Sequence, residues 1–392
     1  MSRQIFDVGE YEGRIERTRA WMAERELDAI VVADPANMNY LTGYDGWSFY
    51  VHQAVVLAAD RDEPLWVGRE MDANGARATT RLTEDSIRAY SDDHVHSPVD
   101  LHPMDYLAGV LEELNVDGGR IGLEMDASYF TAKSYTRLQR NLPDATFEDT
   151  TLLVNWVRIR KSARELEYMR QAARISENAM VAGLDAIDEG VPEYEVARTI
   201  YDALIGGTDE YGGDYPSIVP LMPSGDHTGT PHLTWTDREF EAGDPVIIEL
   251  SGCRHRYHSP LARTAFVGDP PAAMERIADV VVEGIEAALD VAAPGVTCEA
   301  VERAWRETIA AHDIEKEDRI GYSMGLGYPP DWGEHTASLR PGDETVLEED
   351  MTFHMIPGIW GDDFGVELSE TFHVTGDGAE TLADFPRRLF TA

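Results

Sequence analysis

The segment that most constrains the fold lies at residues 243–268, GDPVIIELSGCRHRYHSPLARTAFVG, and is predicted to form two adjacent β-strands. Apolar residues at helical spacing bracket it on both sides. Two helices are expected before it, at residues 163–188 and 192–205, and two after it, at residues 271–292 and 298–312. Further strands are expected beyond these helices. This order predicts an α+β domain in which helices cover an antiparallel sheet.

The first part of the chain has a different pattern, in which strands and helices alternate. The expected strands are residues 29–33, 53–59, 64–68 and 120–124, and the expected helices are residues 10–26, 100–113 and 129–142. Such alternation is typical of an α/β domain. The sequence therefore predicts two domains, an α/β domain at residues 1–157 and an α+β domain at residues 158–392.

The chain is strongly acidic, with 73 acidic and 33 basic residues and a net charge of −40. Such a surface repels nucleic acid and anionic membranes. The acidic residues are spread along the chain, which favours adaptation to high salt over binding of a partner through an acidic tail. Salt at about 1 M screens charge repulsion within about 3 Å.

Other features of the composition indicate a soluble cytoplasmic protein. The two cysteines, Cys253 and Cys298, do not suggest a disulfide framework. No apolar run reaches the length of a membrane-spanning helix, and the N-terminal residues lack the apolar core of a signal peptide. We therefore expect a cytoplasmic location.

The segment ELSGCRHRYHSPLART resembles the pita-bread superfamily of methionine and Xaa-Pro aminopeptidases, prolidases and creatinases. RIRKSARELEYMRQAARI is similar to the start of the catalytic domain in that superfamily. The resemblance implies a creatinase-like N-terminal domain and a pita-bread catalytic domain. Its metallopeptidases carry D-x-G and then Y-x-S-D-x-T-R-T, with three further ligands downstream. The resemblance places these residues at the five ligand positions: Glu249, Pro260, Tyr322, Ile356 and Ser369.

These five residues are a poor set of metal ligands, because a dication needs several oxygen or nitrogen donors at once. Proline and isoleucine offer no side-chain donor. We therefore expect a site without a metal or another cofactor. The alternative is that His354, His258 or Glu370 builds a new mononuclear site. His258 and His354 could equally be ordinary, partly exposed histidines.

Three residues are predicted to be catalytic: Glu249, His232 and Tyr322. His232 occupies the place of a histidine that metal-free creatinase uses for proton transfer. Glu249 lies in a buried strand, where a carboxylate is costly unless paired, so it is expected to face a pocket as a general base or as a clamp for a cationic substrate. The alternative for Glu249 is an ion pair with Arg254, Arg256 or Arg263. Tyr322 could donate a hydrogen bond.

Two segments rich in aromatic and ionisable residues are predicted to be functional loops, at residues 39–50 and 327–335. Aromatic faces attract delocalised cations, with about 0.5–2 kcal/mol for each contact. The alternative is packing at a domain or subunit interface, which applies most to Tyr40 and Phe49. The residues predicted to bind substrate are Trp47, Tyr50, Glu334, His335 and His354.

Several longer runs, among them PANMNYLTGYDGWSFY, HTGTPHLTW and GLGYPPDWGEHTASLRPGDETVL, are similar to the ectoine hydrolases, a metal-free group of the superfamily. The resemblance implies ring opening of ectoine, a small zwitterionic cyclic amidine that bears a carboxylate, to N-acetyl-2,4-diaminobutyrate. It also implies a homodimer in which an N-terminal loop of one subunit reaches the pocket of the other. The alternatives are a creatinase-like amidinohydrolase, an Xaa-Pro metallopeptidase and a non-catalytic binding module.

Overall fold

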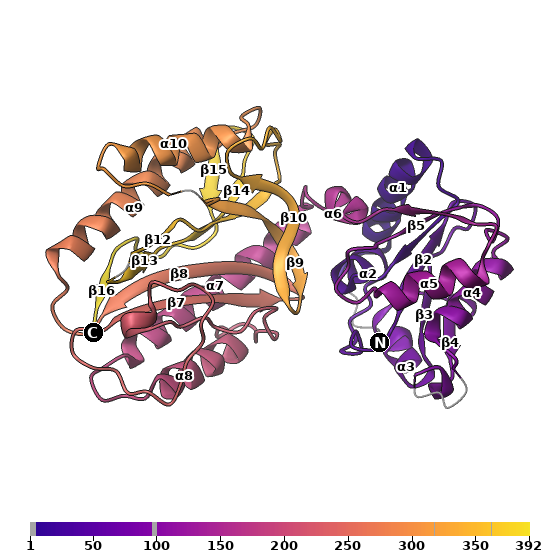
Figure 1. Cartoon of the computed structure of the whole chain (residues 1–392), viewed down its shortest axis with the longest axis horizontal. Coiled ribbons are helices and arrows are strands. Elements are labelled where there is room, and N and C mark those ends of the chain that lie inside the picture. The colour runs from indigo at the N-terminus through magenta and orange to yellow at the C-terminus, as the bar shows by residue number, and fades with distance from the viewer. Residues whose placement is uncertain (1–4, 96–99, 317, 362) are drawn as a thin grey trace. The chain divides into compact units, whose positions relative to one another are not determined.

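The computed structural model describes residues 5–95, 100–316, 318–361 and 363–392. Its contacts divide the chain into two compact units, Met1–Arg158 and Ile159–Ala392. The predicted fold class is confirmed in each: the first unit is an α/β domain, and the second is an antiparallel sheet with helices against it (Figure 1).

The first unit is built on a six-stranded sheet of order β4-β3-β2-β1-β5-β6. β1 pairs parallel with β5 and antiparallel with β2, so the sheet is mixed. Its strands are β1 (Ala29–Val32), β2 (Ala54–Ala58), β3 (Leu65–Arg69), β4 (Ile87–Tyr90), β5 (Arg120–Leu123) and β6 (Thr146–Asp149). Its helices are α1 (Val8–Glu24), α2 (Pro35–Thr42), α3 (Ala73–Thr79), α4 (Pro103–Glu113), α5 (Ala132–Asn141) and α6 (Leu153–Val157).

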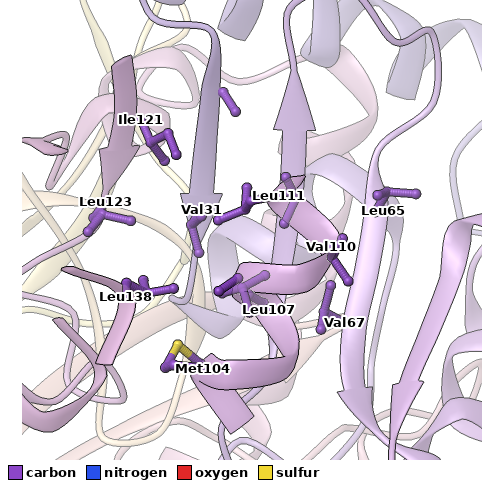
Figure 2. Packing of buried hydrophobic residues seen from close by; sticks show 14 of the residues in the cluster. Val31, Leu65, Val67, Met104, Leu107, Val110, Leu111, Ile121, Leu123 and Leu138 are labelled. Atoms are coloured by element: carbon purple, nitrogen blue, oxygen red, sulfur yellow. The ribbon is translucent and has the colours of Figure 1, made fainter. Parts of the chain in front are cut away.

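Alternate strand residues form the core of this unit. Successive side chains of a strand point to opposite faces of the sheet, so residues two apart share a face. Val31 of β1, Val67 of β3 and Leu123 of β5 all belong to one buried cluster with Leu107 of α4 and Leu138 of α5 (Figure 2). The apolar face of α4 therefore closes one side of the sheet.

The second unit contains an eight-stranded sheet whose main path is β15-β14-β11-β9-β8-β16, with β7 paired to β8 and β10 paired to β9. The strands of this sheet are β7 (Pro245–Arg254), β8 (Tyr257–Phe266), β9 (Gly321–Tyr328), β10 (Asp331–Leu339), β11 (Thr352–Met355), β14 (Glu370–Val374), β15 (Ala379–Thr381) and β16 (Phe390–Thr391), and β12 (Gly358–Trp360) and β13 (Gly365–Glu367) form a separate two-stranded sheet. The helices of this unit are α7 (Ala163–Ala186), α8 (Glu193–Gly206), α9 (Ala272–Val291) and α10 (Cys298–Ala310). Figure 1 shows α7 and α8 beside β7 and β8, with α9 and α10 at the opposite side of the unit.

The β7–β8 hairpin confirms the two strands predicted at residues 243–268. It is antiparallel throughout, and Glu249 lies opposite Ala262. Its two-residue turn, His255-Arg256, has φ values of 51° and 70°, the backbone that a tight hairpin with right-handed twist requires. The turn is held by its surroundings, because the His255 amide donates to Asp214 at 2.6 Å and the Arg256 guanidinium lies 3.5 Å from the centre of the Tyr215 ring.

Helix α7 determines which face of β7 is covered. Its first turn has a capping box in which the Ser162 amide donates to the Glu165 carboxylate at 2.8 Å, and Tyr257 of β8 donates to the same carboxylate at 2.7 Å. Gly252 of β7 lies so close to α7 that a Cβ atom there would be 2.2 Å from the Ala172 carbonyl oxygen. Because strand side chains alternate, Glu249 points to the face opposite α7.

Residues 327–335 are not the irregular loop that the sequence predicted. They form the end of β9, a turn at Pro329-Pro330 and the start of β10. The turn residues hid the alternation on either side, and Trp332 is buried in the sheet. Neither cysteine forms a disulfide, and both are buried. A search of the helices in the described part of the chain finds none with the length and apolar character of a membrane span.

Candidate active site

A cleft of about 1120 Å³ in the second unit brings together the three residues predicted to be catalytic, Glu249, His232 and Tyr322. They come from β7, from the loop that follows Gly225–His227, and from β9. The remaining lining residues are Ile218, Leu221, Pro231, Lys316, Asp318, Arg319, Pro330, Asp331, Arg340, Pro341, Ile356, Trp360 and Glu367.

Glu249 is a buried carboxylate without a hydrogen-bonding partner among the described residues, and it is 7% exposed. An ion pair of Glu249 with one of the three arginines is not seen: Arg263 binds Glu370 at 2.7 Å, Arg254 binds Gln171, and Arg256 donates to the Tyr215 carbonyl. Burial, and after it the negative charges of Glu367 and Asp331, raises the pKa of Glu249 well above its ordinary value. A carboxylate in this state gains from any cation or hydrogen-bond donor that enters the cleft.

Glu367 of β13 is the site residue that the sequence interpretation missed. Its backbone is fixed by Thr264 of β8, whose hydroxyl accepts from the Glu367 amide at 2.8 Å and donates to its carbonyl at 2.8 Å. One carboxylate oxygen, Oε1, is buried without a hydrogen-bonding partner in the described structure. Burial raises the pKa of Glu367 to about 7, although Lys316 acts in the opposite direction. The cleft therefore contains, besides Glu249, a second carboxyl group whose charged form is disfavoured by burial.

A signal for Glu367 was present in the sequence. Residues two apart share a face, so Glu367 lies on the face of Ser369, whereas the neighbouring Glu370 points to the other side. Glu370 accepts from Arg263 at 2.7 Å and from Arg387 at 3.1 Å and is thus compensated within the core.

The Glu367 pKa predicts a pH-dependent difference in stability. A carboxyl whose pKa is raised on folding stabilises the protein below about 4.5 and loses that contribution as the pH rises through about 7. Glu367→Gln should remove this loss. We expect the melting temperature of the variant, relative to the original protein, to increase between pH 5 and pH 8.5 in calorimetry. Glu286→Gln, an exposed change on α9, is the control and should show a constant difference. Parallel pH profiles for the Glu367→Gln and original proteins would contradict this assignment.

Two arginines line the same cleft without a carboxylate partner in the described part of the chain. Arg319 lies over the Tyr322 ring, 4.6 Å from its centre, and Arg340 is exposed at the end of β10. Lys316 differs from both, because its ammonium group donates to the Gly358 carbonyl at 3.0 Å and lies over the Trp360 ring. The cleft thus offers two arginines to an anionic group.

Tyr322 is joined to two residues behind the cleft wall. Its hydroxyl oxygen lies 3.1 Å from Nδ1 of His354 and accepts from Trp332 at 2.9 Å. His354 is fully buried and does not line the cleft, so the expectation of a partly exposed histidine was wrong for His354. It was also wrong for His258, which is fully buried and accepts from the Ser217 amide at 2.9 Å. Direct binding of substrate by His354 gains no support from this position.

Glu334 and His335 are also absent from the residues that line the cleft. Glu334 is fully buried and pairs with Lys161 at 3.0 Å, with the Lys161 side chain 1% exposed. His335 is exposed and pairs at 2.9 Å with Asp331, a residue that does line the cleft. The two were predicted from a presumed loop, and the β9–β10 hairpin turns them away from each other because they are consecutive in a strand.

His232 occupies the loop side of the cleft. It is exposed, its φ is 66°, and no hydrogen-bonding partner for its ring lies among the described residues. A left-handed backbone at a residue other than glycine is often retained at functional sites. This location is compatible with the predicted proton transfer, which stays a prediction.

Trp47 and Tyr50 belong to the first unit and are exposed by 57% and 67%. The Trp47 ring contacts Phe49, and Tyr50 accepts from Arg69 at 3.4 Å. Tyr40 and Phe49 are buried, so packing within their own unit accounts for both. Binding of substrate by Trp47 and Tyr50 stays a prediction.

The side chains at the five expected ligand positions do not fit a metal centre. Pro260 and Ile356 have no donor atom, and Ser369 already binds the Ala262 amide and His354. The alternative mononuclear site gains no support either, because His258, His354 and Glu370 each contact other protein groups. Within the described ranges, no three His, Cys, Asp or Glu side chains are grouped closely enough to hold a metal ion.

Comparison with known proteins identifies the class to which this fold and cleft belong. Residues 167–376 match the description "Metallopeptidase family M24", and residues 14–160 match the "Creatinase/Prolidase N-terminal domain". The chain belongs to the M24 family and carries the creatinase/prolidase N-terminal domain.

Individual relatives narrow this class. The chain is 46% identical to an ectoine hydrolase from Halomonas elongata, over 98% of each chain. It is 26% identical to an Xaa-Pro dipeptidase from Pyrococcus furiosus, over 96% of this chain and 99% of the other. A prolidase structure from Thermococcus sibiricus superposes with a TM-score of 0.85 at 20% identity, over 97% of this chain and 99% of that one, which shows the shared fold.

Proposed function

We propose that this protein hydrolyses ectoine, opening the ring of the cyclic amidine to give N-acetyl-2,4-diaminobutyrate. The observation that carries this proposal is a single cleft with two uncompensated carboxylates, Glu249 and Glu367, and two arginines without carboxylate partners among the described residues. Ectoine has a cationic amidine and a carboxylate, which match these two kinds of group. The relative from Halomonas elongata, 46% identical over nearly the whole chain, supports the same substrate.

The carboxylates would bind the amidinium, and an arginine would bind the substrate carboxylate. An amidinium has N–H donors in one plane, and carboxylate oxygens accept such donors with strong, charge-assisted bonds. Arg319 and Arg340 present planar guanidinium groups that suit the substrate carboxylate. We therefore assign the amidinium to Glu249 and Glu367, and the carboxylate to Arg319 or Arg340.

The proposed reaction begins with the addition of water to the amidinium carbon. That carbon is already electron-poor, so Glu249 can serve as the base that takes a proton from the attacking water. The ring C–N bond then breaks as the C=O bond forms, and the departing NH takes up the two hydrogens that the water loses, with His232 as the candidate donor, to become the ammonium group of the product. Water supplies the acetyl oxygen, and the product retains both nitrogens. Since the ligand positions carry too few donors for a metal, we propose that the reaction is metal-independent.

Creatine is the second candidate substrate, because it combines a guanidinium with a carboxylate and would meet the same two kinds of group. Peptide hydrolysis is disfavoured, since an uncharged amide carbon needs stronger activation than the cleft residues offer. A homodimer in the cytoplasm remains part of the proposal, and the net charge of −40 supports work at high salt.

One assay set separates these functions. Protein treated with a chelator is offered ectoine, creatine and an Xaa-Pro dipeptide, and products are followed by NMR. We expect ectoine turnover that is unchanged by chelation. Creatine turnover alone would establish the second candidate. Peptide cleavage restored by manganese would overturn metal independence, and inertness toward all three substrates would indicate a binding module.

A further inference from the structure

A line of three hydrogen bonds leads from the cleft into the core of the second unit. The Tyr322 hydroxyl lies 3.1 Å from Nδ1 of His354, and Nε2 of His354 lies 2.8 Å from Oγ of Ser369. Oγ of Ser369 in turn accepts from the Ala262 amide at 2.7 Å. His354 and Ser369 are fully buried, and Tyr322 lines the cleft.

The Ala262 amide at one end determines which group donates and which accepts in each of these hydrogen bonds. An amide N–H can only donate, so Ser369 accepts at that contact and has its own hydrogen left to donate. Within the described structure, the acceptor in reach of that hydrogen is Nε2 of His354. A ring nitrogen that accepts a hydrogen bond carries no hydrogen of its own, so a His354 ring bound in this way is neutral. A neutral ring that accepts at Nε2 carries its hydrogen on Nδ1, which therefore donates to Tyr322.

The Tyr322 hydroxyl oxygen then accepts two hydrogen bonds, one from Nδ1 of His354 and one from Nε1 of Trp332. Its own hydrogen has no acceptor among the described protein groups and is left to point toward the cleft. The opposite polarity would have Tyr322 donate to His354 and His354 donate to Ser369. The buried Ser369 hydrogen would then have no acceptor, which is unfavourable for a polar group in a protein core.

We infer that Ser369 and His354 are positioning residues, which hold Tyr322 as a hydrogen-bond donor directed at a ligand in the cleft. This rests on the proposed function for the identity of the acceptor. The nitrogens of an amidinium have no lone pair to accept a hydrogen bond. Once water has added to the carbon, the departing ring nitrogen gains a lone pair and can accept from Tyr322. The donor therefore stabilises the transition state more than bound substrate, and its loss should lower kcat rather than raise KM.

The tautomer of His354 can be measured without any substrate. Protein labelled with ¹⁵N histidine distinguishes a protonated ring nitrogen from a bare one by NMR, and the His354→Asn variant identifies the signals. We expect a proton on Nδ1 and none on Nε2. A proton on Nε2 in the original protein would overturn the inference, whether or not the protein hydrolyses ectoine.

The kinetic test compares three variants with ectoine as substrate. Tyr322→Phe should lower kcat by about 10²-fold, the order found when one well-placed donor is removed, with KM within about twofold. Ser369→Ala should lower kcat about tenfold and let the proton of His354 move to Nε2. Ser323→Ala is the matched control, because Ser323 is a buried β9 residue whose hydroxyl binds Thr336 at 2.6 Å, and it should leave kcat unchanged. Equal losses in Ser323→Ala and Ser369→Ala would indicate a general packing effect and contradict the positioning role. If the original protein is inert toward ectoine, the proposed substrate fails, and the NMR result alone decides the inference.

Discussion

Glu249→Gln should reduce kcat/KM for ectoine by about 10³-fold or more, while the folded protein is at least as stable as before. Glutamine preserves the shape of the side chain but can neither accept the proton of the attacking water nor balance the charge of an amidinium. General bases contribute about 10²–10⁴-fold to rates, and the loss of the cation clamp adds to this. Turnover followed by NMR and unfolding followed by calorimetry measure the two halves of the prediction.

The expectation that Glu249→Gln does not lower the stability follows from the surroundings of the Glu249 side chain. The carboxylate is buried, lacks a hydrogen-bonding partner among the described residues and lies near the negative charges of Glu367 and Asp331. A neutral amide removes that repulsion, so no loss of melting temperature is expected. Glu286→Gln, an exposed change in α9, serves as the control and should leave turnover unchanged. Near-normal turnover in Glu249→Gln would remove this residue from the catalytic assignment.

Glu334→Ala should have the largest effect on stability, a loss of about 3–5 kcal/mol in the free energy of unfolding, because it leaves a buried ammonium without its carboxylate. Lys161 lies 3.0 Å from Glu334, and both side chains are almost completely buried. The Ile159 carbonyl, 2.8 Å from the Lys161 ammonium, would remain as an acceptor but supplies no full charge. Urea denaturation of the variant and of the original protein gives the difference.

Two further variants identify the cause of that loss. Glu348→Ala breaks the pair with Arg160, in which both side chains are 54% exposed, and should cost about 0–1 kcal/mol. The double variant Lys161→Met and Glu334→Leu removes both buried charges and should recover most of the stability. A stable Glu334→Ala protein that has lost turnover would instead favour the original prediction that Glu334 contacts substrate.

The fold was accessible from local patterns in the chain. Helical spacing of apolar residues located α7 to α10 to within a few residues, and strand-like runs located the β7–β8 hairpin. These signals are local, because a helix or a hairpin buries its apolar side chains at a period set by its own geometry. The prediction failed at residues 327–335, where Pro329 and Pro330 separate β9 from β10 and the register of β10 against β9 shifts after Asp331 and again after Gly333.

The candidate site was only partly accessible in this way. Glu249 could be singled out because an acidic residue inside an apolar strand requires an explanation. The sequence could not rank Glu367 above the other acidic residues, because it does not show which of them pair with a cation. Glu370, three positions later, pairs with Arg263 from a distant strand. The sequence could not reveal the surroundings of Glu334 for the same reason, because Lys161, with which it pairs in the core, lies 173 positions away.

Residue types and their spacing were thus enough to predict the fold class and the β7–β8 hairpin, and the resemblance to the pita-bread superfamily placed the poor set of metal donors. The tertiary structure decided which charges are compensated and which face the cleft. It also decided the direction of the hydrogen bonds behind Tyr322, through the Ala262 amide, which reaches Ser369 across 107 positions of chain. Partner choice among polar groups depends on such long-range contacts, and periodicity carries no information about them.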